Sequence, residues 1–282
     1  MLLLQIVVLA LIQGITEVLP LSSTGHLALL PLLTPWPSPT TWPDQGVALD
    51  VAVHLGTLGA VALYFWRDEA AMIGGCPRVL KGKRDPGARL AFLVVLGTLP
   101  AVATVLLLAH FAGPIASPGL ATIGWTTLGF GLLLGVIDRL CMTVKRVEHM
   151  GGIDCLLIGL AQCLALLPGV SRTGVAMTAA RLLGYERVES ARFSMLLSIP
   201  AIAGAATLVG LDLARVGQSA MAPAALIAAV TAFLAAFLAV AAMMAWLRRH
   251  GFGPFVAYRV LLGAALLALA YLGPDLAPFL VS

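Results

Sequence analysis

The chain has 282 residues, of which 60% are hydrophobic and only 11% are charged, and its formal net charge at pH 7 is +4. So few polar residues cannot cover the surface of a soluble globular domain, which leaves a polytopic membrane protein with a single membrane domain over residues 1–282. The basic excess does not indicate a nucleic-acid partner, because the lysines and arginines lie in short segments between apolar runs, where they set the membrane topology.

The first apolar segment, residues 3–18, predicts a helix that carries Gln13 and Glu17 four residues apart on one face. Pro20 ends this helix. After a polar turn at residues 21–25, residues 26–33 can form only about two helical turns, roughly 12 Å, against the roughly 30 Å of a hydrocarbon core. Helix, turn and short helix therefore predict a hairpin that enters the membrane and returns to the same side.

The longer apolar runs predict full spans. They are expected at about residues 47–66, 90–111, 118–137, 193–211, 222–247 and 254–273. A second hairpin is expected to descend over residues 153–167 and return over residues 173–183. Residues 67–89 are predicted to be a basic cytoplasmic loop, and in this topology all but three of the 17 Lys and Arg residues lie inside.

The two hairpins have related sequences. Residues 11–25 read LIQGITEVLPLSSTG and residues 160–174 read LAQCLALLPGVSRTG, with glutamine, leucine-proline, serine and Thr-Gly at matching places 149 residues apart. Since one hairpin enters from each side, we predict an all-α integral membrane protein with an inverted-topology repeat. It has two re-entrant helical hairpins and about six full transmembrane helices, with pseudo-repeats at about 1–137 and 138–282. Non-helical backbone at this depth must be covered by protein or line a wet cavity, so both turns are expected to line one pocket.

The polar residues of the two turns suit phosphate chemistry. Arg172, between two hydroxyls in an apolar setting, offers a planar fork of donors to phosphate oxygens. Glu17 can hold a hard divalent cation that completes its shell with water and substrate phosphates. Ser23 can attack phosphorus or position the attacking water, and His26 lies near enough in sequence to take the proton. These residues predict phosphoryl transfer, or hydrolysis of a phosphoanhydride on a lipid.

Four stretches carry a family resemblance. QGITEVLPLSSTGHL, LDVAVHLGTL, PGVSRTG and RFSMLLSIPAIAGA resemble, in order along nearly the whole chain, those of the undecaprenyl-diphosphate phosphatase family, also called the bacitracin-resistance protein family. The resemblance implies hydrolysis of undecaprenyl diphosphate to undecaprenyl phosphate and inorganic phosphate, which recycles the carrier lipid for cell-wall polymer synthesis. It also implies a divalent metal ion, Mg or Ca, and a multi-pass protein of the bacterial inner membrane whose active site opens to the periplasmic side.

With the family's motifs carried over, we assign catalytic roles to Glu17, Ser23, His26 and Arg172, with Glu17 also the metal ligand. The substrate-binding residues are then Gln13, Ser22, Thr24, Gly169, Ser171 and Thr173. Three positions depart from the family pattern, since Gln13 replaces a frequent second carboxylate, Thr173 a serine and Ala176 a threonine. Gln13 offers less negative charge to a metal and Ala176 lacks a hydrogen-bonding group, so weaker activity or a different lipid preference would follow.

Structural roles compete with these assignments. Arg172 could pair with Glu17 as a structural bridge, His26 could be a packed histidine, and Ser22 and Thr24 could cap the short helix. Glu17 could also be a proton-relay or structural carboxylate.

Asp50 and His54 share one face of the first full span, and either enter the pocket or form hydrogen bonds between helices. Two other functions compete with the phosphatase: a transporter or flippase of a phosphorylated polyprenyl lipid, and a weakly active paralogue that binds lipid diphosphate. The expected partners are the polyprenyl diphosphate lipid and the membrane, with no nucleic acid, and a homodimer is left open.

Overall fold

The computed structural model describes residues 3–34, 36, 46–111, 119–141, 143–216 and 222–280. Within these ranges the chain is built from helices, which agrees with the predicted all-α class. The α-helices are α1 Leu3–Val18, α2 Ser23–Leu33, α3 Gly46–Tyr64, α4 Trp66–Leu80, α5 Pro86–Phe111, α6 Leu120–Leu140, α7 Gly152–Cys163, α8 Arg172–Leu182, α9 Arg187–Val216, α10 Ala222–Leu247 and α11 Gly253–Leu280. Two short 3-10 helices, Val147–His149 and Leu164–Leu166, flank α7.

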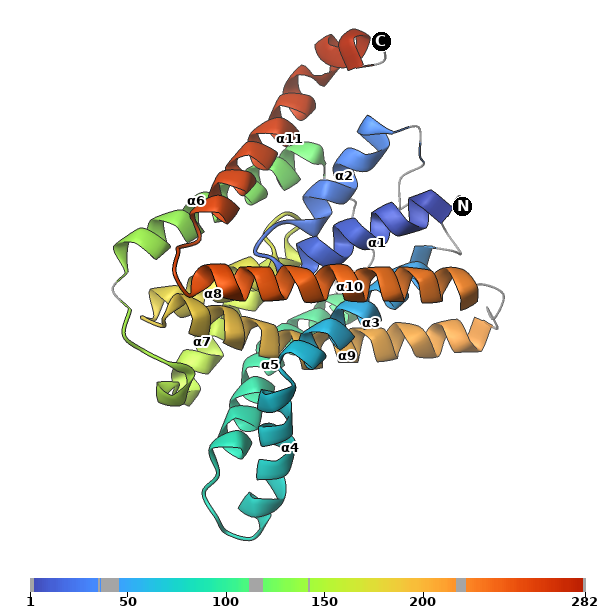
Figure 1. Ribbon diagram of the computed structural model, residues 1–282. Coiled ribbons are helices and arrows are strands. Elements are labelled where there is room, and N and C mark those ends of the chain that lie inside the picture. Colours follow the sequence, from blue (N-terminus) through green and yellow to red (C-terminus); the bar gives the residue numbers. More distant parts are fainter. Residues whose placement is uncertain are drawn as a thin grey trace.

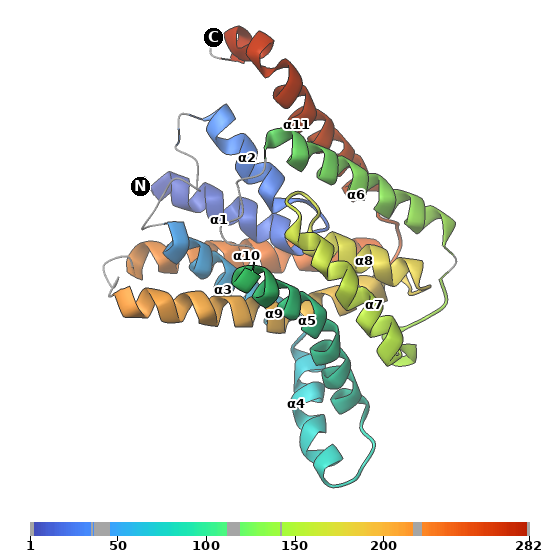
Figure 2. The same ribbon diagram turned by 180° about the vertical axis from the view of Figure 1, so that it is seen from behind.

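The helices pack as pairs that are distant in sequence. α10 lies along both α1 and α3, and α6 lies along α11, as Figures 1 and 2 show from opposite sides. α5 packs on α7, and α9 packs on α3, α5 and α8. The short helix α8 packs on α6, α7 and α9, and the short helix α2 contacts α1, α6 and α11.

Four helices in the described part of the chain are long and apolar enough to cross a membrane. They are Pro86–Phe111, Leu120–Leu140, Pro223–Leu247 and Gly253–Leu272. A bent pair, Ala48–Tyr64 and Trp66–Val79 at 80°, would make a fifth span. The chain is thus a multi-pass membrane protein with four or five candidate spans, where about six were predicted. The remaining predicted span, residues 193–211, lies within α9. Part of the side chains of α9 fall outside the described residues.

The prediction of a loop over residues 67–89 was wrong. α4 occupies most of this segment and packs against the start of α5, and the resulting hairpin projects from the other helices in Figure 1. Two glycines allow this close approach: a Cβ on Gly75 would lie 2.4 Å from the amide nitrogen of Ala88, and one on Gly87 would lie 2.1 Å from the carbonyl oxygen of Ala71. Glycine and proline lower helix propensity here, and packing on α5 compensates.

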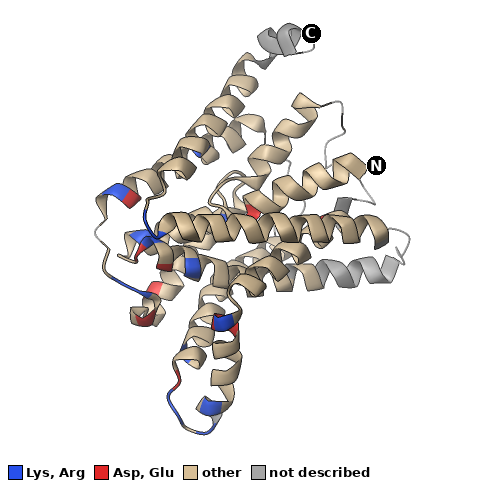
Figure 3. Ribbon diagram, viewed as in Figure 1, with Lys and Arg blue, Asp and Glu red and all other residues tan. Residues whose placement is uncertain are grey.

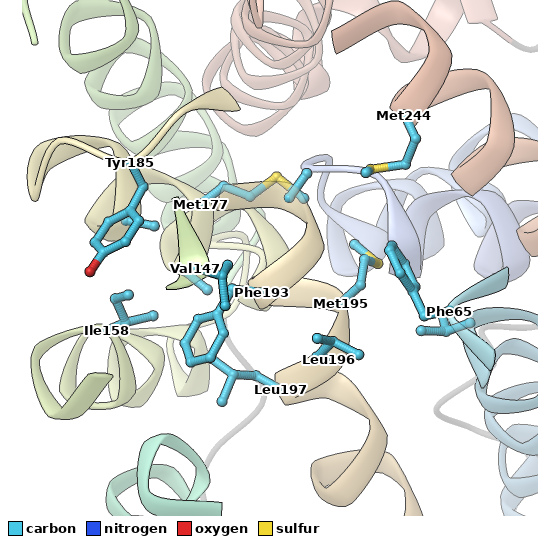
Figure 4. Close-up of a cluster of buried hydrophobic side chains, with 14 of the residues drawn as sticks. Phe65, Val147, Ile158, Met177, Tyr185, Phe193, Met195, Leu196, Leu197 and Met244 are labelled. Atoms are coloured by element: carbon cyan, nitrogen blue, oxygen red, sulfur yellow. The ribbon is translucent and has the colours of Figure 1, made fainter. Parts of the chain in front are cut away.

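A buried cluster of large side chains lies around α8 and the start of α9. Figure 4 shows Met177 of α8 and Phe193 and Leu196 of α9 within it, and these three side chains are fully buried. Phe65, at the bend between α3 and α4, joins the same cluster. The position of α8 is therefore fixed by the close packing of this cluster.

Charged residues are concentrated at one end of the bundle. In Figure 3 they colour the α4–α5 hairpin and the helix ends around α7, while the described parts of α1, α2 and α10 are nearly free of them. At this end Asp138 of α6 is 7% exposed and pairs with Arg181 at 3.0 Å and Arg187 at 2.8 Å. It also accepts the backbone N–H of Phe252 at 3.1 Å. Arg181 and Arg187 thus join helix ends through Asp138.

Candidate active site

The first turn of the site connects α1 and α2. α1 ends at Val18, just before Pro20, whose ring cannot continue the hydrogen-bonded helix. Ser22 then caps α2, because its Oγ accepts the backbone N–H of Gly25 at 3.1 Å. This confirms the capping role considered for Ser22. Glu17 stands on the last turn of α1 and Ser23 is the first residue of α2.

The second turn, between α7 and α8, repeats this arrangement 149 residues later. Ser171 caps α8, with its Oγ accepting the backbone N–H of Gly174 at 3.3 Å. Ser171 has φ of 68°, a left-handed conformation that a residue other than glycine adopts only when its surroundings impose it. Gly169, with φ of 94°, has no room for a side chain, since a Cβ would lie 2.1 Å from the Oγ1 of Thr126.

The two turns contact each other directly. The Nη2 of Arg172 donates to the Oε1 of Glu17 at 3.0 Å, and the Oγ1 of Thr173 donates to the carbonyl oxygen of Leu19 at 2.9 Å. The Arg172 and Glu17 side chains are each 20% exposed. The Nη1 of Arg172 is buried and has no hydrogen-bond partner among the described residues. A buried, unpaired guanidinium nitrogen is costly, and an anion beside it would satisfy it.

A cavity of about 380 Å³ opens beside this contact. Its polar wall includes Glu17, Ser22, Ser23, Thr24, Ser171 and Arg172. Gly169 and Gln162 also line it. The structure therefore brings residues from both turns to one cavity, which agrees with the predicted shared pocket.

Other predicted site residues point elsewhere. Thr173 is 1% exposed, and its hydroxyl is engaged with Leu19 and, at 3.2 Å, with Ser171. The ring of His26 stacks on that of Tyr258 in α11, and His26 is not among the described residues that line the cavity. Its Nδ1 donates to the carbonyl oxygen of Ser22 at 2.6 Å, so in the neutral ring Nε2 accepts from the Tyr258 hydroxyl.

Gln13 lies one turn before Glu17, outside the described cavity wall. Its Nε2 donates to the Oδ1 of Asp50 in α3 at 3.1 Å, and the Nδ1 of His54 donates to the Asp50 carbonyl oxygen at 2.8 Å. Two roles were considered for Asp50 and His54, a place in the pocket or a hydrogen bond between helices. Asp50 forms such a hydrogen bond, with Gln13 of α1. His54 and Glu17 interact electrostatically.

Sequence reasoning missed the residues that support the second turn. Arg259 of α11 is fully buried; its Nη2 donates to the carbonyl oxygen of Gly169 at 3.0 Å and its Nε to that of Thr127 at 3.2 Å. The hydroxyl of Thr126 donates to the carbonyl oxygen of Pro168. These contacts join α6 and α11 to the turn. The one sequence signal was that Arg259 lies within an apolar span, because a charged residue in a membrane helix usually has a polar partner.

The donor set fits a metal ion only in part. Across the described ranges no group of three or more His, Cys, Asp and Glu side chains could by itself hold a metal. The cavity wall offers one carboxylate, Glu17, with hydroxyls nearby. This set fits Mg²⁺ or Ca²⁺ that is bound through one carboxylate and takes its other ligands from substrate phosphates and water, which is common for Mg²⁺.

Comparison with known proteins identifies the family. The family described as bacitracin resistance protein BacA matches residues 6–265, which include both turns. The chain belongs to the BacA family. It is 99% identical over 282 residues to Undecaprenyl-diphosphatase 1 of Rhodospirillum rubrum, with 100% of both chains covered. It is also 48% identical over 269 residues to the Undecaprenyl-diphosphatase of Ruegeria pomeroyi, covering 95% of this chain and 98% of the relative.

A more distant relative is the Undecaprenyl-diphosphatase of Hahella chejuensis. The chain is 46% identical to it over 274 residues, with 95% of this chain and 98% of the relative covered. The resemblance predicted from the sequence motifs is therefore confirmed over nearly the whole length of the chain.

Proposed function

We infer that this BacA family member is an undecaprenyl-diphosphatase, which hydrolyses undecaprenyl diphosphate to undecaprenyl phosphate and inorganic phosphate and so recycles the lipid carrier of cell-wall synthesis. Relatives of that name match it over 100% and 98% of their length. The structural observation that carries the inference is the shared cavity, to which one turn contributes Glu17 and Ser23 and the other Arg172. An arginine with hydroxyls on an apolar-walled cavity suits the head of a lipid diphosphate.

Arg172 is our proposed ligand for the terminal phosphate. Its Nη2 is held by Glu17, which orients the guanidinium, and its Nη1 remains to donate to a phosphate oxygen. α2 and α8 both begin at the cavity, so the positive ends of their dipoles face the same anion. These groups stabilise the charge that builds on the phosphoryl oxygens during transfer.

Ser23 is our proposed nucleophile or the group that positions the attacking water. In either case the new oxygen bond to the terminal phosphorus forms as the bond to the bridging oxygen breaks, and undecaprenyl phosphate leaves. If Ser23 is the nucleophile, water then breaks the bond between phosphorus and the serine oxygen, which frees the serine and releases inorganic phosphate. His26 is our proposed proton acceptor. To act, its Nε2 must first release the hydroxyl of Tyr258, because in the neutral ring this nitrogen is the only one without a proton.

Glu17 would hold the divalent ion implied by the family resemblance, with Gln13 one helical turn away. When bound, such an ion supplies further neutralisation of phosphate charge.

We also propose that the two halves form an inverted repeat. α1 packs on α10 and α7 packs on α5, which is the arrangement expected if α1 corresponds to α7 and α10 to α5. The matching serine caps at Ser22 and Ser171 support the same correspondence. The charged end in Figure 3 would be cytoplasmic by the positive-inside rule, and the active site would open to the periplasmic side of the inner membrane.

The test is phosphate release by the purified protein from undecaprenyl diphosphate in detergent, with and without Mg²⁺. Release should require the cation and should be abolished by Arg172→Ala and by Glu17→Ala. Arg248→Ala, at an exposed site after α10, should behave like the unmodified protein. Transport of a phosphorylated polyprenyl lipid across liposomes without any phosphate release would instead identify a flippase.

A further inference from the structure

The cavity has an apolar half that the phosphate chemistry does not use. This half is lined by Ala101, Val102, Val105 and Leu106 of α5 and by Ala201 and Gly204 of α9. Most of the polar residues that line the cavity come from the two turns, among them Ser23 and Arg172. The lining thus combines a polar part with an apolar part, as an amphiphilic ligand does.

The apolar half also faces outward. Val102, Val105 and Leu106 line the cavity, yet their side chains are 41%, 45% and 56% exposed on a helix that can cross the membrane. Exposed apolar side chains along a helix of spanning length are what a cavity that opens sideways to lipid requires. A lipid can pass through such an opening without its chain crossing water.

The packing differs along these two helices. Near its middle α5 packs closely on α9, because a Cβ on Gly97 would lie 2.9 Å from the Leu197 side chain. Further along α9, a Cβ on Gly204 would meet no atom of the described residues within 4 Å. Figure 2 shows α5 and α9 together on the side away from α11.

We propose that the polyprenyl chain of the substrate leaves the phosphate site through this opening between α5 and α9, and that Gly204 keeps it free. This rests on the proposed diphosphatase function. The hydroxyl of Ser194 donates to the carbonyl oxygen of Thr173, which ties α9 to the start of α8. Gly204 lies ten residues further along α9, about 15 Å at the helical rise. A short prenyl chain ends before this point, whereas an undecaprenyl chain passes it.

The experiment compares Gly204→Leu with Gly129→Leu in the full-length protein. Gly129 is an exposed glycine in α6 whose Cβ would likewise meet nothing within 4 Å, so the control makes the same change of helix propensity on a surface outside the cavity. Phosphate release is measured from geranyl diphosphate and from undecaprenyl diphosphate. Gly204→Leu should lower kcat/KM for the undecaprenyl substrate at least about tenfold, as blocking an apolar subsite does, and change that for geranyl diphosphate less than about threefold.

Unchanged kcat/KM for the undecaprenyl substrate would overturn the proposal, as would an equal loss on both substrates. If the unmodified protein releases no phosphate from either lipid, the proposed function itself fails. Should Gly204→Leu not fold, Gly204→Cys can be modified after purification with a bulky alkyl methanethiosulfonate. Activity on the long substrate should then fall and return on reduction, while the unmodified protein, treated in the same way, controls for its own four cysteines. No loss after labelling of Cys at this position would overturn the proposal.

Discussion

Replacement of Arg172 by lysine separates the positive charge of this residue from its donor geometry. The guanidinium uses Nη2 for Glu17 at 3.0 Å and leaves Nη1 buried without a partner among the described residues. Lysine keeps the charge but has one nitrogen on a flexible stem, so it cannot hold the carboxylate and a phosphate oxygen in the same planar geometry. We expect Arg172→Lys to lose one preorganised donor to the transition state.

The expected size follows from other sites of this kind. Loss of one such donor lowers kcat by about 10²–10³, or roughly 2.7–4 kcal/mol. Stability should change little, because lysine still neutralises Glu17 in a pair that is partly exposed. Arg172→Ala should be worse in both respects, since it leaves the carboxylate unpaired.

The assay is phosphate release from undecaprenyl diphosphate over a range of concentrations, with melting curves of each variant and Arg248→Lys as the control. A double-mutant cycle with Glu17→Gln adds a second test. If Glu17 acts only by orienting Arg172, its replacement should cost little further in the Arg172→Lys background, whereas loss of a metal ligand would still lower activity. Arg172→Lys with kcat/KM within threefold of the unmodified protein would refute the two-donor reasoning.

Four further variants test the surroundings of the site. Ala176→Thr restores the family residue at a position that is 1% exposed, so it should destabilise the protein by about 1–3 kcal/mol through overpacking without raising turnover; higher turnover at an unchanged melting temperature would contradict this. Gln13→Glu would set two carboxylates together, because Gln13 now donates to Asp50 at 3.1 Å, and its melting temperature should fall in a chelator and recover with Mg²⁺. Identical melting under both conditions would count against this expectation. Tyr258→Phe frees the Nε2 of His26 and should leave kcat within about threefold, while His26→Gln should lower it at least about 10²-fold; equal losses would mean that the two rings only brace each other.

Much of the architecture was predictable because it depends on local properties of the chain. Low polar content places the chain in a membrane, and Pro20 with the short apolar run after it predicts a hairpin too short to span. Ser22 was recognisable as a capping candidate, since a serine just before a helix accepts a free amide regardless of what surrounds it, whereas the matching cap at Ser171 was not predicted. The family motifs, too, lie in continuous stretches and are visible without coordinates.

What the sequence could not give is the direction of side chains that meet across the fold. His26 was paired with Ser23 because they are three residues apart, yet its ring contacts Tyr258, 232 residues away. The segment of α4 was expected to be a loop. It forms a helix because its packing on α5 compensates for the low helix propensity of its glycines and proline, and this packing cannot be read from the segment alone.

The sequence by itself determined the membrane class, the two related turns and the residue types of the site, because composition, helix ends and motifs are properties of short segments. Only the tertiary structure decided that Glu17 and Arg172 touch, that Arg259 donates to the second turn, and that Gly204 of α9 lines the same cavity as residues of α5. These contacts join segments far apart in the chain, and their geometry follows from the packing of whole helices, which no local pattern records.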